Sequence, residues 1–469
     1  MSTLERLHPT ILREYDIRGI VGDMLTLGGM RSIGRAFGAM VAEAAESGGR
    51  QVVVGYDGRL SSPSLEAELV EGLLESGVDV VRIGLGPSPM LYFAAHHLRA
   101  DGGMMITGSH NPPDYNGIKM VKGGKPFFGD QIQALGRMID SGVFPGAGKG
   151  RGRVTLQDIK PAYLDRLVVD MTKAGRPQTV VWDPGNGAAA AVIEGLCDRL
   201  PGRHVLINAE VDGTFPSHHP DPTVPENLVQ LQDAVARERA DLGIAFDGDG
   251  DRIGVIDGDG RIVWGDQLLT ILARSVLAEV PGATIIADVK SSKVFFDEIA
   301  RMGGTALMSR TGHSLIKTMM VETGAALAGE MSGHIFFAHR YYGFDDALYA
   351  AVRLLDLLAR SDESMAAMRD AMPSMLNTPE LRIDCEEERK FGVIEEVKSR
   401  LRDAPDLAVD DIDGVRVTNG DGWWLLRASN TQPVLVGRCE ATTESGLAAL
   451  RQELARQLTA SGIDPVAVL

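Results

Sequence analysis

The chain has 469 residues, of which 44% are hydrophobic and 24% are charged, as is ordinary for globular proteins. This length exceeds what one hydrophobic core supports, so we expect about three or four domains. The formal net charge of −17 argues against a nucleic-acid-binding protein, because such a protein needs a broad cationic face. It does not exclude a small anionic substrate, which needs only a local cluster of Arg and Lys.

The cysteines and the first residues indicate where the protein works. Cys197, Cys385 and Cys439 lie far apart without the spacing of a metal site, which suits a reducing cytosol. The first ten residues contain no apolar signal core, and no apolar run approaches the length of a membrane span. We therefore expect a cytoplasmic protein with neither a membrane nor a nucleic-acid partner.

Three segments of the chain repeat the pattern of strand, helix and strand. Each first strand is followed at once by an aspartate: 51–56 by Asp57, 179–182 by Asp183, and 284–287 by Asp288. Each second strand leads into a polar loop; these strands are 104–107, 243–246 and 325–328. Helical periodicity lies between them, as at 64–76 and 228–239. The alternation predicts mostly parallel sheets with helices on both faces and ligands beyond the carboxyl ends of the strands.

The pattern changes after about Met372. A predicted helix at 391–402 precedes short strands at 414–418, 422–427 and 434–440 and a terminal helix at 443–461. The predicted fold is α/β: three consecutive mixed α/β/α sandwich domains of similar topology plus a smaller C-terminal α+β domain. We place their boundaries at 1–154, 155–260, 261–372 and 373–469, with a hinge near Met372.

The first polar loop lies in Thr107–Lys119, TGSHNPPDYNGIK. The strand stops at Gly108, and Ser109 and His110 follow without a gap. Pro112-Pro113 then stiffens the exit, because each ring fixes φ and restricts the residue before it. A serine that projects from the end of a strand suits phosphorylation or nucleophilic attack. The same residue types are also typical of an ordinary turn rich in Gly, Asn and Pro, so that alternative stays open.

The second polar loop carries carboxylates at every second position: Asp247, Asp249 and Asp251. Such a cluster repels itself unless it holds a hard cation, and oxygen ligands suit Mg²⁺ or Ca²⁺. An EF-hand is excluded by position, because the sixth and twelfth residues are Arg252 and Gly258 rather than Gly and Glu. The similar DGDG at 257–260 lies between apolar runs and is interpreted as a hairpin turn.

Other tempting patterns point to structural roles. The segment 84–89 departs from a dinucleotide-binding fingerprint at Pro89, where glycine is required. The pairs His96-His97 and His218-His219 have neither the ligand spacing of a metal site nor the accompanying acidic residues that such a site needs. We therefore expect neither a nicotinamide cofactor nor a histidine-bound metal.

Four motifs occur in an order that identifies a family. They are TGSHNP with Ser109, the aspartate triad, GEMSGH at 329–334 and RASNT at 427–431. Together they resemble the α-D-phosphohexomutase family, specifically its bacterial phosphomannomutase/phosphoglucomutase branch. The likeness runs from Arg13 to Arg438, which is nearly the whole chain.

This resemblance implies a phosphohexomutase acting on hexose 1-phosphate and hexose 6-phosphate, of mannose and/or glucose. Ser109 would carry a phosphoryl group, pass it to the sugar and recover the other phosphate from a bisphosphorylated intermediate. Mg²⁺ would be bound by Ser109 and the three aspartates, and hexose 1,6-bisphosphate would be activator and intermediate. The enzyme would be a monomer or a dimer.

The resemblance also implies roles for individual residues. Acid/base and transfer chemistry would involve Ser109, Lys119 and His334, assisted by His110, Arg18 and Arg252; a lysine crowded by cations can have its pKa lowered toward neutrality. The sugar would contact Glu330, Ser332, Tyr15, Lys290 and His313. The second phosphate would be held by Arg427, Ser429, Asn430 and Thr431. Arg310 stands where the family's KTGHS segment has lysine, which puts that contact in doubt.

Three alternatives remain open. A serine hydrolase or phosphatase would need a nucleophile elbow, and Ser109 lacks the G-x-S-x-G pattern. A non-catalytic sugar-phosphate sensor would be expected to lose the nucleophile or a metal ligand. Ser109 and all three aspartates of the triad are present. A phosphoglucosamine mutase should favour a different sugar loop, whereas Ser332 beside Glu330 suits neutral hexoses.

Overall fold

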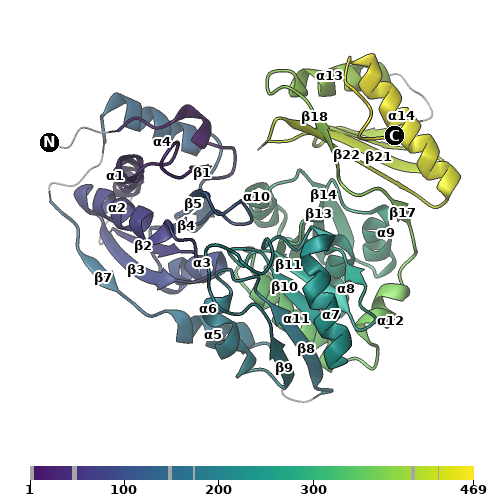
Figure 1. The fold of residues 1–469 in the computed structure, drawn as a ribbon, viewed down its shortest axis with the longest axis horizontal. Helices are drawn as coiled ribbons and strands as arrows, with labels where there is room; N and C mark the ends of the chain where they lie inside the picture. Colours follow the sequence, from purple (N-terminus) through teal and green to yellow (C-terminus); the bar gives the residue numbers. More distant parts are fainter. Residues whose placement is uncertain (1–4, 45–49, 146–149, 173–174, 403–406, 431) are drawn as a thin grey trace.

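The computed structural model describes residues 5–44, 50–145, 150–172, 175–402, 407–430 and 432–469. Three α/β domains follow one another along the chain, and a smaller domain at the C-terminus lies across from the first (Figure 1). The predicted fold class is confirmed. No helix in the described part of the chain has both the length and the apolar character needed to cross a membrane.

Domain 1 is built on a sheet with the strand order β1-β5-β4-β2-β3-β7, in which β6 pairs with β5. Its strands are β1 (Ile17–Ile20), β2 (Gln51–Tyr56), β3 (Asp79–Leu85), β4 (Gly102–Ile106), β5 (Tyr115–Lys122), β6 (Lys125–Pro126) and β7 (Val154–Leu156). Its helical elements are η1 (Pro9–Ile11), α1 (Leu27–Ala44), α2 (Ser62–Glu75), α3 (Ser88–His97) and α4 (Asp130–Ser141).

Domain 2 has a sheet with the order β12-β11-β10-β8-β9. Its strands are β8 (Gln178–Asp183), β9 (Gly202–Leu206), β10 (Leu242–Phe246), β11 (Ile253–Asp257) and β12 (Ile262–Val263). Its helical elements are α5 (Lys160–Val168), α6 (Ala190–Cys197), η2 (Pro225–Leu228) and α7 (Val229–Glu238). The turn between β11 and β12 is the hairpin predicted at DGDG, and the two strands pair antiparallel.

Domain 3 has a sheet with the order β14-β13-β15-β16. Its strands are β13 (Thr284–Asp288), β14 (Thr305–Ser309), β15 (Leu327–Gly329) and β16 (Ile335–Phe337). Its helices are α8 (Gly265–Glu279), α9 (Lys293–Arg301), α10 (His313–Thr323), α11 (Ala347–Ala359) and α12 (Met365–Asp370).

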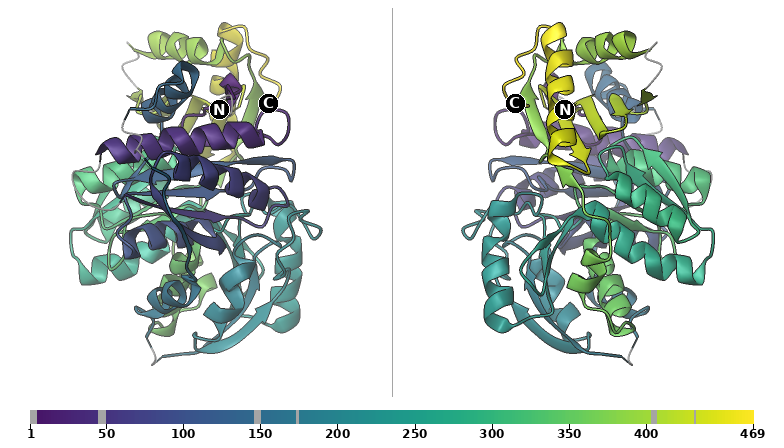
Figure 2. Two further views of the ribbon diagram at one scale, coloured as in Figure 1. Left: turned by 90° about the vertical axis from the view of Figure 1, so that its left-hand side faces the viewer. Right: turned by 90° about the vertical axis from the view of Figure 1, so that its right-hand side faces the viewer.

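The C-terminal domain has an antiparallel sheet with the order β17-β22-β21-β20-β19, in which β18 also pairs with β22. Helices α13 and α14 lie together on one side of it (Figure 2). Its elements are β17 (Leu376–Asn377), β18 (Leu381–Asp384), α13 (Lys390–Leu401), β19 (Ala408–Asp410), β20 (Val415–Thr418), β21 (Gly422–Ala428), β22 (Val434–Ala441) and α14 (Glu444–Ala460).

The three α/β domains place their polar loops in the same topological position. Each loop follows a strand that is parallel to its neighbour and then turns into a strand that runs antiparallel to it: β4 to β5, β10 to β11, and β15 to β16. Of these return strands, only β11 was predicted from the sequence, as the apolar run before the hairpin turn at 257–260; β5 and β16 were not predicted. The return strands make each sheet mixed and hold both ends of each loop at one sheet edge.

A continuous hydrophobic core joins the three α/β domains. It includes Phe93 of domain 1, Trp182 of domain 2 and Tyr349 of domain 3, all at least 98% buried. Separate clusters stabilise the outer part of domain 1 and the C-terminal domain. The three loop edges are therefore fixed relative to one another by shared packing, since burial of apolar surface stabilises by about 25 cal/mol per Å².

Candidate active site

Ser109 lies at the carboxyl end of β4 in a strained backbone conformation. Its φ is +49°, a value that non-glycine residues rarely adopt, and its N–H donates to Thr107 Oγ1 at 2.8 Å. The side chain is 2% exposed, and Oγ donates to Asp247 Oδ2 at 2.8 Å. His110 Nδ1 lies 3.1 Å from the same oxygen. Burial, together with the charges of Arg252 and Arg18, lowers the pKa of His110 well below its usual value.

Asp247, Asp249 and Asp251 meet beside Ser109, all fully buried. Their carboxylate oxygens lie within 4.8 Å of one another. Burial and the two neighbouring carboxylates raise the pKa of Asp247 well above its usual value. The buried oxygens Asp249 Oδ1 and Asp251 Oδ1 accept no hydrogen bond from the described residues. This donor set fits a hard divalent cation, because carboxylate oxygens are its preferred ligands and unpaired buried carboxylates are costly.

Lys119, on β5, contacts the triad. Its Nζ donates to Asp249 Oδ2 at 2.7 Å and also bonds to Asp251. Burial lowers the pKa of Lys119, but the two carboxylates outweigh it, and the pKa lies well above the usual lysine value. The expectation of a lysine crowded by cations was therefore wrong for this state of the protein: carboxylates surround it, which keeps it charged.

His334 links the loop of the aspartate triad to domain 3. Arg252 and His334 form an isolated antiparallel bridge, and Arg252 Nε donates to His334 Nε2 at 3.1 Å. A guanidinium can only donate, so Nε2 accepts and the ring proton sits on Nδ1. That nitrogen lies 3.3 Å from Asp345 Oδ2 and 3.6 Å from Asp251 Oδ1.

Asp345 was missed by the sequence analysis and is a central buried charge of the site. Its carboxylate also lies 3.3 Å from His313 Nδ1 and 2.9 Å from Lys317 Nζ. Burial and the charge of Lys317 lower the pKa of His313 to about 4, and the rings of His313 and His334 stack at 5.6 Å. Nothing local could have identified Asp345, because its partners come from helix α10 and from the turn between β15 and β16.

Glu330 lies in the turn between β15 and β16, where it is 3% exposed. Its Oε1 accepts from the N–H of Gly312 at 2.7 Å, and burial raises the pKa of the carboxyl group. The same turn is held from the end of β13, because Met331 N–H donates to Asp288 Oδ1 at 3.1 Å. Ser332 lines the cleft beside Glu330, with a partly exposed side chain.

The C-terminal domain presents cationic groups to the same space. Arg427 Nε donates to Asp413 Oδ2 at 2.9 Å, and Arg438 Nη1 donates to the carbonyl of Lys290 at 2.7 Å. Lys290 Nζ pairs with Glu380 at 3.1 Å, which lowers the pKa of that glutamate to about 2. The sequence analysis named Arg427 and Lys290 but gave Arg438 no role.

Asn430 joins the C-terminal domain to domain 1. Its Nδ2 donates to the hydroxyl of Tyr15 at 2.6 Å, and Tyr15 in turn donates to the carbonyl of Thr311 at 2.8 Å. Burial raises the pKa of Tyr15 to about 12. Ser429 is buried and its Oγ accepts from Gln432 N–H at 3.2 Å, whereas Thr431 lies outside the described residues.

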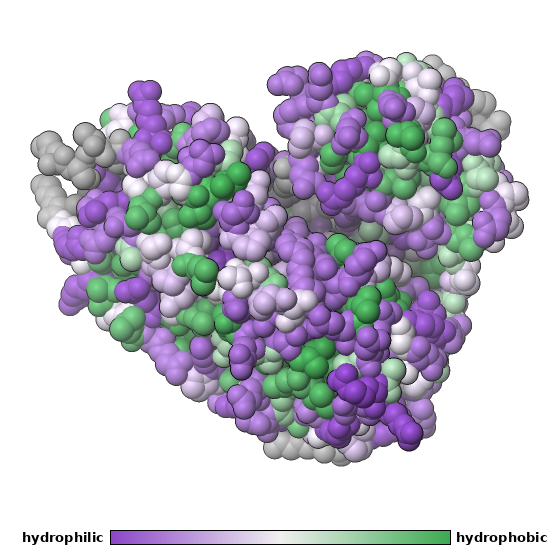
Figure 3. Space-filling model, viewed as in Figure 1, coloured by the Kyte–Doolittle hydropathy of each residue, from purple (hydrophilic) through white to green (hydrophobic). Residues whose placement is uncertain are grey.

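Most of these residues line one cleft of about 1230 Å³, to which all four domains contribute. The buried carboxylates Asp247, Asp249, Asp251 and Asp345, and the side chain of Asn430, are not on its lining. Figure 3 shows the hollow where it opens, between the lobe of domain 1 and the C-terminal domain. Arg18 lines it and donates to the carbonyl of Gly108 at 3.3 Å. The predicted residues on its lining are Tyr15, Arg18, Ser109, His110, Lys119, Arg252, Lys290, His313, Glu330, Ser332, His334, Arg427 and Ser429. Arg310 is exposed and is not part of this lining.

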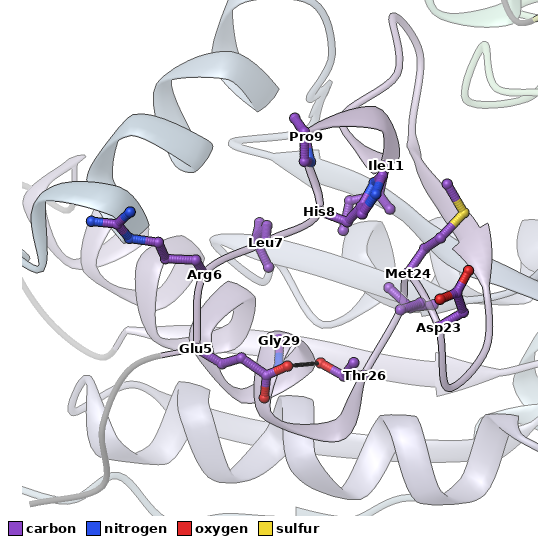
Figure 4. Close-up of a pocket in the computed structure, with 11 residues that line it drawn as sticks. Glu5, Arg6, Leu7, His8, Pro9, Ile11, Asp23, Met24, Thr26 and Gly29 are labelled. Atoms are coloured by element: carbon purple, nitrogen blue, oxygen red, sulfur yellow. Dashed lines mark hydrogen bonds between the residues drawn. The ribbon is translucent and has the colours of Figure 1, made fainter.

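A smaller pocket of about 290 Å³ lies between the N-terminal segment and the loop before α1 (Figure 4). Glu5 and Thr26 are hydrogen-bonded across it at 2.7 Å. None of the predicted catalytic or binding residues lines it. The large cleft is therefore the candidate active site.

Comparison with known families matches four domains in order along the chain. They are described as phosphoglucomutase/phosphomannomutase alpha/beta/alpha domain I (residues 9–145), domain II (161–260), domain III (264–375) and the C-terminal domain (380–457).

Similar proteins cover nearly the whole chain. A phosphomannomutase/phosphoglucomutase of Pseudomonas aeruginosa is 46% identical over 98% of each chain, and a phosphoglucomutase of Neisseria gonorrhoeae is 45% identical over 93% of this chain and 94% of its own. The crystal structure of a phosphoglucomutase/phosphomannomutase family protein of Burkholderia thailandensis superposes with a TM-score of 0.91 at 43% identity, over 97% of this chain and 98% of the other. The chain belongs to the phosphoglucomutase/phosphomannomutase family.

Proposed function

We propose that this protein interconverts hexose 1-phosphate and hexose 6-phosphate, of mannose and/or glucose, through a phosphoserine at Ser109. The observation that carries the proposal is that two groups of side chains suited to phosphate line the same cleft. Ser109, beside the aspartate triad, belongs to one group, and Arg427 with Arg438 forms the other. A mutase needs both, because its intermediate carries a phosphate at each end.

In the first half-reaction, phosphorylated Ser109 would give its phosphoryl group to a free hydroxyl of the sugar phosphate. The bond from phosphorus to the serine oxygen breaks and a bond to the sugar oxygen forms; the sugar hydroxyl loses its proton, and the serine oxygen gains one. His110 Nδ1 is within hydrogen-bond distance of Ser109 Oγ, so it is placed to exchange a proton there. Lys119 and His334 are the further acid/base candidates.

Mg²⁺ bound by Ser109 and the three aspartates would neutralise charge that builds up on the phosphoryl oxygens. Arg252, beside the triad, would stabilise the same oxygens as a fixed cation. Phosphoryl transfer requires mainly positioning and electrostatic stabilisation, and these buried charges supply both.

The bisphosphorylated sugar must then turn end over end, so that Ser109 takes back the other phosphate. Arg427, Ser429, Asn430 and Thr431 would hold the phosphate that is not being transferred, since charge-assisted bonds to it are the strongest available. Glu330 and Ser332 would hold two ring hydroxyls in either orientation, with Tyr15, Lys290 and His313 completing the sugar site. Glucose and mannose differ only in configuration at C2, so hydrogen bonds to hydroxyls other than the one at C2 would allow the site to bind both sugars.

The test is a pair of coupled assays with α-glucose 1-phosphate and α-mannose 1-phosphate, each with Mg²⁺ and a trace of hexose 1,6-bisphosphate. Ser109→Ala is run beside Ser64→Ala, an exposed serine on α2 that serves as the matched control. Turnover that is lost only in Ser109→Ala supports the proposal, together with a phosphate mass on the peptide that contains Ser109. Activity on glucosamine phosphate alone would favour the amino-sugar mutase, and activity on none would favour a sensor.

A further inference from the structure

A short segment of domain 2 bridges the two reactive loops. This bridging segment, residues 215–221, follows β9 and carries the sequence FPSHHPD. His219 Nε2 lies 2.5 Å from the carbonyl oxygen of His110, next to Ser109. The carbonyl of Pro220 accepts from the N–H of Gly248, inside the aspartate triad, at 3.1 Å. Two consecutive residues therefore hold the phosphoserine loop on one side and the metal-binding loop on the other.

The bridging segment is anchored in its own domain by Asp183, at the end of β8. His218 Nε2 lies 2.9 Å from Asp183 Oδ2, and His218 Nδ1 lies 3.0 Å from the carbonyl of His219. Both ring nitrogens thus face acceptors. Burial lowers the pKa of His218, but its bond to Asp183 outweighs this and the pKa is raised. Asp183, which is distant in sequence and adjacent in space, thus gives His218 one carboxylate partner, and neither histidine of the pair belongs to a group of three possible metal ligands among the described residues.

Arg59 holds the phosphoserine loop from the opposite side. Its side chain is fully buried, and Nη2 donates to the carbonyl of Ser109 at 2.8 Å and to that of Asn111 at 2.6 Å. The guanidinium also lies 5.2 Å from the ring of Phe215, the first residue of the bridging segment. The loop is thereby fixed between an arginine of domain 1 and a histidine of domain 2.

The loop that carries Ser109 and the loop of the aspartate triad are in direct backbone contact. A Cβ at Gly248 would lie 2.3 Å from the carbonyl oxygen of Ser109, so the loops meet backbone to backbone. Ser109 Oγ donates to Asp247 Oδ2 at 2.8 Å in this arrangement, with a φ of +49° that non-glycine residues rarely adopt and that requires support from the surrounding structure. The carbonyl of His110 can only accept, so His219 donates to it from Nε2.

We propose that His219 is a positioning residue for the phosphoserine loop. Its Nε2–H binds the carbonyl of His110 and so sets the distance between Ser109 Oγ and the aspartate triad. The inference rests on the proposed function, and it predicts an effect on the transfer step, because misplacement of a reacting group by about 1 Å costs about 100-fold in rate.

The experiment compares His219→Ala, which removes the donor, with His219→Gln, whose amide N–H reaches a similar position. Gln230→Ala is the control: its exposed side chain donates to the carbonyl of Ser217 on the outer side of the bridging segment. We expect kcat to fall about 10–100-fold in His219→Ala with KM within about twofold, near recovery in His219→Gln, and no change in Gln230→Ala. Rapid-quench transfer from the phosphorylated enzyme to glucose 1-phosphate should fall in parallel with kcat.

An unchanged kcat in His219→Ala, or a change confined to KM, would overturn the inference while the wild type remains an active mutase. An equal loss in His219→Ala and His219→Gln would do the same, because the donor would then not matter. If the wild type has no mutase activity, the proposed function fails. The inference is then decided by crystal structures of wild type and His219→Ala: an unchanged distance from Ser109 Oγ to Asp247 Oδ2 refutes it, and a lengthened one supports it.

Discussion

Asp346 offers a sharp test of the buried electrostatics that join domains 2 and 3. It precedes α11, and its carboxylate accepts from Tyr349 N–H at 2.9 Å, from the hydroxyl of Tyr163 at 3.0 Å and from that of Tyr341 at 2.8 Å. Burial nevertheless raises its pKa from 3.8 to about 7, despite these three donors. The perturbation is Asp346→Asn, which removes the titration and keeps one acceptor oxygen.

The sign and size of the effect follow from proton linkage. Between about pH 4 and pH 7 the native protein holds a proton on Asp346 that the unfolded chain has released, so the free energy of unfolding falls as the pH rises. Each pKa unit corresponds to about 1.4 kcal/mol, and a shift of about three units amounts to about 4 kcal/mol in total. The contribution is therefore present at low pH and lost as the pH rises through about 7.

The assay is urea unfolding of wild type and Asp346→Asn at pH 5, 6, 7 and 8. Because one core joins the three α/β domains, we expect them to unfold together. The difference in unfolding free energy, Asn minus wild type, should rise by about 2 kcal/mol from pH 5 to pH 7 and level off near pH 8, because Asp346 is still half protonated at pH 7. Constant losses of packing or hydrogen bonding cancel in this slope, so a flat or falling difference refutes the reasoning. Tyr163→Phe removes one donor to the Asp346 carboxylate and should raise its pKa further, so the unfolding free energy should keep falling with pH to a higher pH than in the wild type.

Three further outcomes are expected at the active site. Asp249→Asn should weaken Mn²⁺ binding, measured by calorimetry, by at least about 10–100-fold, the loss typical of residues that only support the ligands; unchanged affinity would place the metal elsewhere. Arg427→Lys should raise KM about tenfold with kcat nearly kept, because lysine cannot reproduce a bidentate contact; an effect on kcat alone would contradict a binding role. Asp345→Asn should lower kcat about 100-fold with little change in KM, since it removes the negative charge that lies 3.3 Å from His334 Nδ1; wild-type turnover would show that this charge is dispensable.

The elements around each polar loop could be predicted from the sequence because their signals are local. The run at 51–56 matches β2 residue for residue, and the predicted helix at 228–239 differs from α7 by one residue at each end. Alternation of apolar runs with Gly and Pro fixes where strands end, and therefore where Ser109 and the aspartate triad lie. The residue types in those loops indicated a phosphorylatable or nucleophilic serine and a site for a hard cation, whereas phosphoryl transfer to a sugar was implied by the family resemblance.

The charge environment of the site was decided only by the tertiary structure. Lys119 is hydrogen-bonded to Asp249, which is 130 residues away in the sequence, and His219 is hydrogen-bonded to His110, which is 109 residues away. Asp345 acquires its partners from helix α10 and from the turn between β15 and β16, and no local pattern marks it. A pKa depends on burial and on charges within a few ångströms, and these distances exist only when the sheet edges of separate domains pack together. The sequence by itself determined which groups this protein offers to a sugar phosphate, and the packing of its four domains decided which of them touch and which carry charge.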